Sequence, residues 1–173
     1  MTVVEKIARE TGAKLKKGRG DFQYALCSHQ SDRFLLVTPL TFMNESGRAA
    51  AQVMKQFSIA SSDMMIVYDD FQLPLGTLRL REEGSDGGHN GLASITDQLK
   101  TTNIPRLRVG IAGKSCPTER KKDSMASYVL SNFDADEVGH AEEMAKHASG
   151  AALDWVHHDI EHAMNNYNKS FLE

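Results

Sequence analysis

Three short segments of the sequence carry amide, carboxylate and imidazole groups that suit chemistry on a ligand. Asn44 lies in TPLTFMNESG, Asp69 lies in YDDFQLPLG, and His89 and Asn90 lie together in GSDGGHNGLASI. An amide donates and accepts hydrogen bonds, a carboxylate orients an imidazole, and an imidazole is the commonest general acid or base near neutral pH. These residue types suit acid–base catalysis or the binding of a polar substrate.

The segment GSDGGHNGLASI combines a glycine-rich loop with the start of an expected helix. Its glycines let the backbone take positive φ and let a ligand approach the main chain. The free N–H groups of the helix would then face an anionic or carbonyl-bearing ligand in the loop. The segment lacks the GKS/T ending of a P-loop and the GxGxxG order of a dinucleotide site. On local grounds, a turn that merely needs glycine is an equally good interpretation.

Apolar periodicity along the chain predicts alternating strands and helices, and therefore an α/β fold with a twisted mixed sheet flanked by helices. A first helix is expected around Val4 and Ala8, ending at Gly12. The run 64–68 is continuously apolar, so we expect a strand that is buried on both faces. The remaining expected elements are strands at 22–28, 34–38, 78–81 and 107–111, helices after Ser46 and at 92–99, and a mostly helical region beyond Asp134 that is weakened at Gly139 and Gly150.

The candidate residues follow expected strands. Asn44 lies between a strand and a helix, just before Ser46, which we expect to cap that helix. Asp69 and Asp70 are expected at the C-terminal end of strand 64–68. Ligands of open α/β sheets bind outside the carboxyl ends of strands, so we expect Asn44, Asp69 and the GGHNG loop to share one cleft. The alternatives are a turn-initiating carboxylate for Asp69 and a helix cap for Asn44.

Charge is unevenly distributed along a chain whose net charge is −3. Residues 131–173 carry nine acidic and two basic side chains, whereas residues 1–130 carry 14 acidic and 18 basic side chains. The basic part keeps nucleic acid open as a partner, and a solvated surface is the alternative. No apolar run approaches the length of a membrane span and no secretory signal is evident, so we expect no membrane partner and a cytoplasmic location.

The segments TFMNESG, DDFQLPLG, GSDGGHNGL and PRLRVGI, in this order and spacing, resemble those of bacterial peptidyl-tRNA hydrolases. YVLSNF resembles the segment before that family's C-terminal helices, and the resemblance extends from about Val3 to the end of the chain. It implies a single peptidyl-tRNA hydrolase-like domain over residues 1–173, which hydrolyses the ester between a peptide and the 3′ ribose of tRNA. It also implies that no metal and no cofactor takes part, and we expect a monomer.

The resemblance assigns roles to the residues around the substrate. Asn44 would hold the peptide part and help to place the water, and Phe42 would line the same pocket. Asn90 would bind the peptide or the 3′ end of the tRNA, with Gly88 and His89 beside it.

Charged residues also receive roles from the resemblance. Asp69 would hydrogen-bond the catalytic histidine and favour its protonated form. Arg81 and Arg108 match positions that bind tRNA phosphates, for which a guanidinium is well suited. Two positions depart from the family pattern: Asp86 replaces a small or neutral residue and would repel a nearby phosphate, and Gln72 replaces a common acid.

The beginning of the sequence departs further. The resemblance implies a buried strand, a glycine-asparagine-proline turn and a segment with the general-base histidine before the helix that matches VVEKIA. Here the sequence begins at that helix, Met1 falls where the family has a large apolar residue, and none of the seven histidines occupies the matching position. We therefore expect an N-terminally short chain, from a short start call or a truncation. Hydrolysis should be weak, because a positioned general base contributes ~10²–10⁴-fold.

Two other functions stay open. One is a non-catalytic relative that binds RNA or a protein partner because the general-base histidine is absent. The other is an unrelated hydrolase in which His89 acts as the base and Asp69 or Asp70 orients it.

A metal site at His157 and His158, beside Asp159, is a further hypothesis. Neighbouring residues of a helix face apart, so we do not expect these residues to share an ion.

Overall fold

The computed structural model describes residues 2–119 and 121–172. Met1, on which part of the N-terminal comparison rests, and Arg120, one of the basic residues counted above, lie outside these ranges, as does Glu173. No helix within the described ranges is long and apolar enough to cross a membrane.

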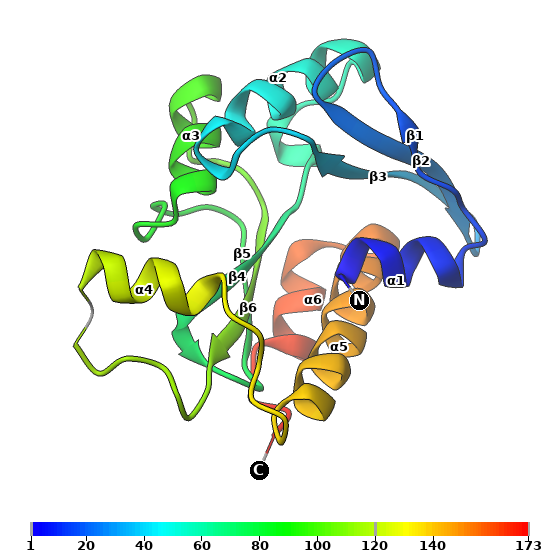
Figure 1. Cartoon of the computed structure of the whole chain (residues 1–173). Helices are drawn as coiled ribbons and strands as arrows, with labels where there is room; N and C mark the ends of the chain where they lie inside the picture. The colour runs from blue at the N-terminus through cyan, green and yellow to red at the C-terminus, as the bar shows by residue number, and fades with distance from the viewer. Residues whose placement is uncertain (1, 120, 173) are drawn as a thin grey trace.

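The strands form two three-stranded sheets, which Figure 1 shows above and below one another. One sheet is antiparallel, with the order β1-β2-β3, and comprises β1 (Lys16–Lys17), β2 (Phe22–His29) and β3 (Asp32–Pro39). The other has the order β4-β6-β5, with β4 parallel and β5 antiparallel to β6, and comprises β4 (Ile66–Pro74), β5 (Leu78–Arg81) and β6 (Arg106–Ala112). The α/β class is confirmed, and its strands are divided between an antiparallel and a mixed sheet.

The helices pack on these sheets in two groups (Figure 1). α2 and α3 pack against each other, whereas α5 and α6 lie against the mixed sheet and α1 contacts both α5 and β3. The helices are α1 (Val3–Glu10), α2 (Ser46–Phe57), α3 (Asn90–Leu99), α4 (Lys122–Val129), α5 (Val138–His157) and α6 (Ile160–Tyr167), with 3₁₀ turns η1 (Met43–Glu45) and η2 (Ser61–Asp63).

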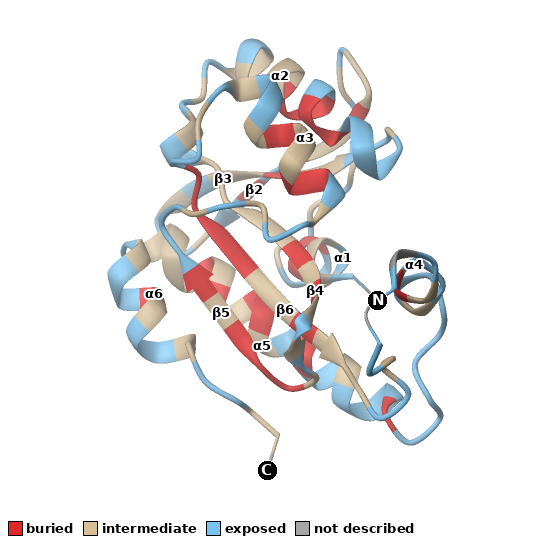
Figure 2. Cartoon of the chain, turned by 90° about the vertical axis from the view of Figure 1, so that its left-hand side faces the viewer, coloured by how far each residue is buried: buried red, intermediate tan, exposed pale blue. Residues whose placement is uncertain are grey.

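The main core lies between the mixed sheet and α5 with α6. Leu78, Leu80 and Leu107 are completely buried there, and they pack with Met144 and Ala148 of α5. Figure 2 shows this burial along β5 and β6. Each buried leucine contributes roughly 1.5–3 kcal/mol relative to an exposed one. This core therefore gives the mixed sheet a firm support for the residues that β4 and β6 carry.

The structure corrects the expected end of strand 64–68. β4 continues to Pro74, so Asp69 and Asp70 lie inside the strand instead of at its C-terminal end. Asp69 pairs with Val109 and Asp70 with Gly110, because β6 extends far enough to continue the ladder. β4 is also an edge strand, so its apolar residues are mostly half-buried, and burial on both faces was a wrong expectation.

The expected cap of α2 was also wrong. Ser46 is the first residue of the helix, and its hydroxyl donates to the Met43 carbonyl at 2.8 Å. Glu45 occupies the cap position without a side-chain hydrogen bond, so Ser46 instead stabilises the turn η1 that leads into the helix.

The C-terminal helical region breaks at His158, whereas Gly139 and Gly150, the expected weak points, both lie within α5. Asp159 caps α6, because its Oδ1 atom accepts a hydrogen bond from the His162 N–H at 2.7 Å. This cap satisfies a free donor of the new helix, which explains why the chain restarts at this point.

Candidate active site

The turn η1 lies against the beginning of α3 because two glycines allow a close approach. The Gly47 N–H donates to Ser94 Oγ at 3.0 Å, and a Cβ at Gly47 would overlap the Ser94 carbonyl oxygen. A Cβ at Gly91 would lie 2.5 Å from Met43 Sδ. Neither contact survives a larger residue without movement, so the two glycines determine how closely these segments approach.

This contact joins two segments that carry candidate residues, because Asn44 lies in η1, Phe42 directly precedes η1 and Asn90 begins α3. Both asparagines are exposed, one in η1 and the other at the first position of α3. Phe42 is 81% exposed, which is unusual for an aromatic residue and suits contact with a ligand. The structure thus brings the segments that carry Asn44 and Asn90 into contact.

His89 caps α3 and packs against β4. Its Nδ1 atom accepts a hydrogen bond from the Leu92 N–H at 3.1 Å, and its ring lies 4.6 Å from the Tyr68 ring, centroid to centroid. With Nδ1 accepting, the neutral imidazole carries its proton on Nε2. His89 is therefore arranged to donate a hydrogen bond to a ligand, not to take a proton from water.

Asp69 lines a cavity of ≈ 410 Å³, and Asn44, His89 and Asn90 are not among the residues that line it. The first residues of α1 and residues of α4 and α5 complete the wall of this cavity. Within residues 2–119 and 121–172, the Asp69 carboxylate has no hydrogen bond or ion pair. Tyr68 lines the same cavity and contacts His89, so it lies between Asp69 and the glycine loop.

Arg106 anchors the glycine loop, a role that the sequence analysis missed. Its side chain is almost completely buried and donates to the carbonyls of Gly84 at 2.7 Å, Ser85 at 2.9 Å, Thr102 at 2.8 Å and Ile104 at 3.1 Å. Burial lowers the pKa of Arg106 below its usual value, although a guanidinium remains charged at neutral pH. A signal was present: an arginine within a short, mostly apolar strand needs partners for its donors.

Both departures from the family pattern hold the same loop. Gln72 Nε2 donates to the Gly87 carbonyl at 2.7 Å, and Asp86 Oδ1 accepts from the Gly88 N–H at 2.7 Å. Gly87 and Gly88 have φ values of 58° and 82°, in the left-handed region that favours glycine. The glycine loop is therefore shaped by Gln72 of β4 and by its own residue Asp86.

The two arginines expected to bind phosphate differ in their surroundings. Arg108 Nε donates to Asp70 Oδ2 at 2.7 Å in a largely buried ion pair. Arg81 is exposed at the end of β5, where its Nη1 donates to the Leu80 carbonyl at 3.0 Å. Arg81 thus has free donors for a phosphate, whereas Arg108 is partly engaged.

Comparison with known proteins gives concordant results. A family model described as peptidyl-tRNA hydrolase matches residues 1–173. The peptidyl-tRNA hydrolase of Chlorobaculum parvum is 40% identical over 168 residues, which cover 97% of this chain and 86% of that protein. The corresponding protein of Pelodictyon phaeoclathratiforme is 41% identical with the same coverage. A crystal structure of peptidyl-tRNA hydrolase from Acinetobacter baumannii matches with a TM-score of 0.87 at 27% identity, covering 98% of this chain and 84% of that one.

Proposed function

The chain belongs to the peptidyl-tRNA hydrolase family, and we propose that Asn44, Asp69 and Asn90 are the residues with which it binds and positions peptidyl-tRNA. Its function is hydrolysis of the ester bond between peptide and tRNA, so it is a carboxylic ester hydrolase that returns free tRNA to translation. The match of the family model to residues 1–173 carries this conclusion. The contact between η1, which carries Asn44, and α3, which begins at Asn90, supports the proposed site.

The proposed reaction is addition of water to the ester. The water oxygen attacks the carbonyl carbon and gives one proton to a base, and the bond from that carbon to the ribose oxygen then breaks. The base returns this proton to the ribose oxygen, which leaves as a hydroxyl, and the carboxylic acid of the released peptide loses its remaining proton to solvent to give a carboxylate. Asn44 and Asn90 would hold the peptide and the 3′ end, Phe42 would cover an apolar part of the substrate, and the Nε2–H group of His89 would donate a hydrogen bond to it.

We propose that none of the seven histidines is the general base for this step. His89 uses Nδ1 to cap α3. The other six lie on the β2–β3 hairpin, on α5 and α6 and between these helices, and none lines the cavity of Asp69: His29, His140, His147, His157, His158 and His162. The chain covers 86% of the Chlorobaculum parvum relative, so that protein has residues without a counterpart here.

Single-turnover hydrolysis of peptidyl-tRNA, with and without added imidazole, tests this arrangement. We expect slow turnover that imidazole increases, because it replaces a missing base. Asp69→Asn should abolish the increase, since Asp69 would favour the imidazolium that forms. Asn44→Ala and Asn90→Ala should each weaken substrate binding about tenfold, the loss of one well-placed hydrogen bond. His140→Gln, an exposed position on α5, is the control.

Other outcomes decide between the alternatives. Fast turnover without imidazole that disappears in His89→Gln would identify His89 as the base and contradict the proposal. Tight binding of peptidyl-tRNA with no turnover, even with imidazole, would indicate a binding protein of the same family.

We also propose that the protein acts as a monomer in the cytoplasm, where translation produces its substrate. Light scattering of the purified protein, alone and with tRNA, tests the oligomeric state. A stable dimer in both samples would contradict this part of the proposal.

A further inference from the structure

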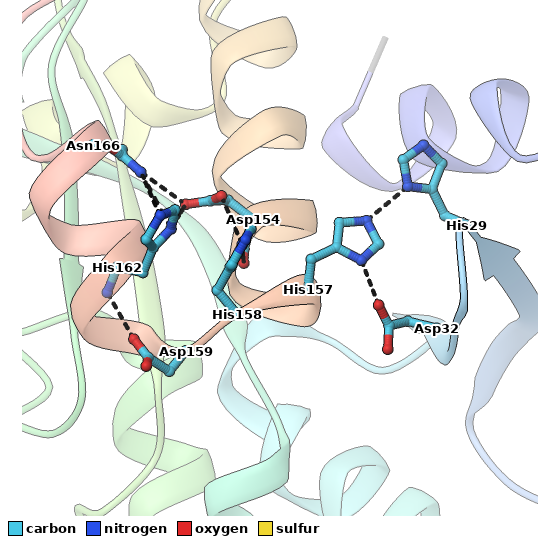
Figure 3. A network of polar contacts seen from close by, with 8 residues as sticks. All are labelled: His29, Asp32, Asp154, His157, His158, Asp159, His162 and Asn166. Atoms are coloured by element: carbon cyan, nitrogen blue, oxygen red, sulfur yellow. Dashed lines mark hydrogen bonds and ion pairs between the residues drawn. The ribbon is translucent and has the colours of Figure 1, made fainter.

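A cluster of metal-binding side chains lies where α5 meets α6. Figure 3 shows Asp154, His158 and His162 facing one another there. His158 Nδ1 is 3.2 Å from Asp154 Oδ1, and His162 Nδ1 is 2.9 Å from Asp154 Oδ2. One ligand atom of each residue lies within 4.8 Å of the others. The cluster contains none of the residues of the candidate active site.

The helix ends explain why these three side chains converge. Asp154 and His158 are four residues apart, so they lie on one face at the end of α5. Asp159 caps α6 through the His162 N–H, and the His162 ring then stacks on the His158 ring with centroids 4.1 Å apart. The break between the helices, which the sequence analysis did not predict, is therefore what brings His162 to Asp154.

We propose that Asp154, His158 and His162 bind a divalent transition-metal ion of the Zn²⁺ type. Two imidazole nitrogens and a carboxylate oxygen are typical zinc ligands, and a water completes a tetrahedron. Ligand atoms of such an ion lie roughly 3.3 Å apart, given bonds of about 2.0–2.2 Å. His158 Nδ1 and His162 Nδ1 lie 3.2 and 2.9 Å from different oxygens of Asp154, and one ligand atom of each residue lies within 4.8 Å of the others, so small side-chain rotations bring the three ligand atoms to this spacing. Mg²⁺ and Ca²⁺ prefer oxygen ligands and fit this set poorly.

The surroundings support an ion that exchanges with solvent. Asp154 is 15% exposed at its side chain, whereas the His158 and His162 side chains are about half exposed, at 51% and 47%. Asn166 Nδ2 lies 3.4 Å from Asp154 Oδ2, so it can hold the carboxylate in place while the carboxylate binds the ion. Metal ligands are commonly oriented by such outer hydrogen bonds.

Without a metal, His162 Nδ1 forms a hydrogen bond with Asp154 Oδ2, and His158 Nδ1 forms one with the Asp154 main-chain carbonyl oxygen. The two arrangements differ in a measurable way. A bound ion links the end of α5 to α6, and an ion that binds only the folded protein stabilises it by mass action. If the three residues form only hydrogen bonds, added metal does not change the stability of the protein.

Isothermal titration of the metal-free chain with ZnCl₂ at pH 7.5 tests the proposal, with thermal unfolding measured in parallel. We expect one tightly bound ion per chain and an unfolding temperature that rises with Zn²⁺ concentration. His158→Gln, His162→Gln and Asp154→Asn should each weaken binding at least tenfold. His140→Gln, which removes an exposed histidine near the start of α5, should bind as the unchanged chain does. Co²⁺ in place of Zn²⁺ should give the visible absorption of a tetrahedral complex.

The unfolding temperature of each variant without metal shows whether it is folded, and both glutamine variants change only half-exposed side chains. The proposal is overturned if the unchanged chain binds no ion, or if His140→Gln weakens binding as much as His158→Gln does. It is also overturned if only His29→Gln or His157→Gln removes binding, because the ion would then lie at the neighbouring histidine pair, whose Nδ1 and Nε2 atoms are 2.7 Å apart (Figure 3).

Discussion

At the scale of single residues, Arg106 connects β6 to the glycine loop. The N–H groups of its guanidinium donate hydrogen bonds to four backbone carbonyls, two of which belong to the loop itself. Loops that bind substrates need such support, because their own backbone makes few regular hydrogen bonds. Arg106 therefore contributes to the shape of the candidate active site without being one of its motif residues.

Replacing Arg106 should destabilise the protein. Arg106→Gln removes charged donors from four backbone carbonyls, of which that of Ile104 is buried, and a hydrogen bond to a charged group contributes about 1.5–3 kcal/mol, so we expect the free energy of unfolding to fall by at least about 3 kcal/mol. Urea denaturation measures this change. Arg33→Gln, at an exposed position in β3, should change it by less than about 0.5 kcal/mol. Similar stabilities for the two variants would show that the loop does not depend on Arg106.

Replacing Arg81, in contrast, should affect the binding of tRNA instead of the stability of the protein. Arg81→Gln removes an exposed charge at the end of β5, so we expect weaker tRNA binding whatever the tRNA sequence. The slope of log affinity against log salt concentration should fall by about one, the value for one lost phosphate contact. Fluorescence titration at several salt concentrations measures both, with Arg33→Gln as the control. An unchanged slope would place the tRNA away from β5.

At the scale of elements, the contact of α2 with α3 determines how η1 approaches the glycine loop. Gly47→Ala should push the two helices apart, because its Cβ would overlap the Ser94 carbonyl, and we expect a loss of about 1–3 kcal/mol of stability. Gly139→Ala is a matched control, since Gly139 is likewise the second residue of its helix and a Cβ there meets nothing within 4 Å. The control should gain up to about 1 kcal/mol.

Thermal unfolding of both glycine variants, with peptidyl-tRNA binding as a second measurement, distinguishes the effects. Weaker binding in Gly47→Ala alone would connect the α2–α3 contact to the site. If Gly47→Ala is as stable as Gly139→Ala, the close approach of the two helices is not required.

Asn168 and Lys169 cover part of the free edge of β5. Asn168 Oδ1 accepts from the Leu80 N–H at 2.6 Å, and the Leu78 N–H donates to the Lys169 carbonyl at 3.1 Å. Covering an edge strand satisfies its backbone and prevents pairing with other chains. The C-terminal segment thus acts as a partial neighbouring strand.

Asn168→Ala should lower the free energy of unfolding by about 1–3 kcal/mol, because the Leu80 N–H loses its acceptor. It should also increase aggregation on heating, since the edge of β5 becomes available. Asn165→Ala, at an exposed position in α6, is the control. Calorimetry with light scattering measures both effects, and equal behaviour of the two variants would refute this role.

At the scale of the whole molecule, burial raises the pKa of three tyrosines, Tyr68, Tyr128 and Tyr167, above the usual value. The folded chain keeps these protons at a pH at which the unfolded chain has lost them. The stabilisation is therefore complete below about pH 10 and is lost as the pH rises through the folded pKa values.

We therefore expect the free energy of unfolding to fall with increasing pH above about pH 10, and to fall less steeply in Tyr68→Phe. Urea unfolding at several alkaline pH values measures the slope, and phenolate absorbance follows the ionisation. Equal slopes in the two proteins would show that Tyr68 contributes nothing to the alkaline loss of stability.

The sequence by itself determined the family, the α/β class and the positions of most elements. Helices and strands were predicted from the spacing of apolar residues, a signal that depends only on residues close together in the sequence. The strands expected at 22–28, 34–38, 78–81 and 107–111 agree closely with β2, β3, β5 and β6. The comparisons with known proteins confirm the family resemblance. The motif TFMN and the glycine loop are also local in sequence, so Asn44 and Asn90 could be proposed as site residues without any coordinates.

Only the tertiary structure decided how residues far apart in the chain meet. The division into two sheets, the cavity beside Asp69 and the bonds from Arg106 to the Gly84 and Ser85 carbonyls all involve residues separated by long stretches of sequence. The cluster of Asp154 with His162 depends on a helix break that glycine positions did not reveal. Such contacts depend on packing between elements, for which a single sequence without relatives contains no direct signal.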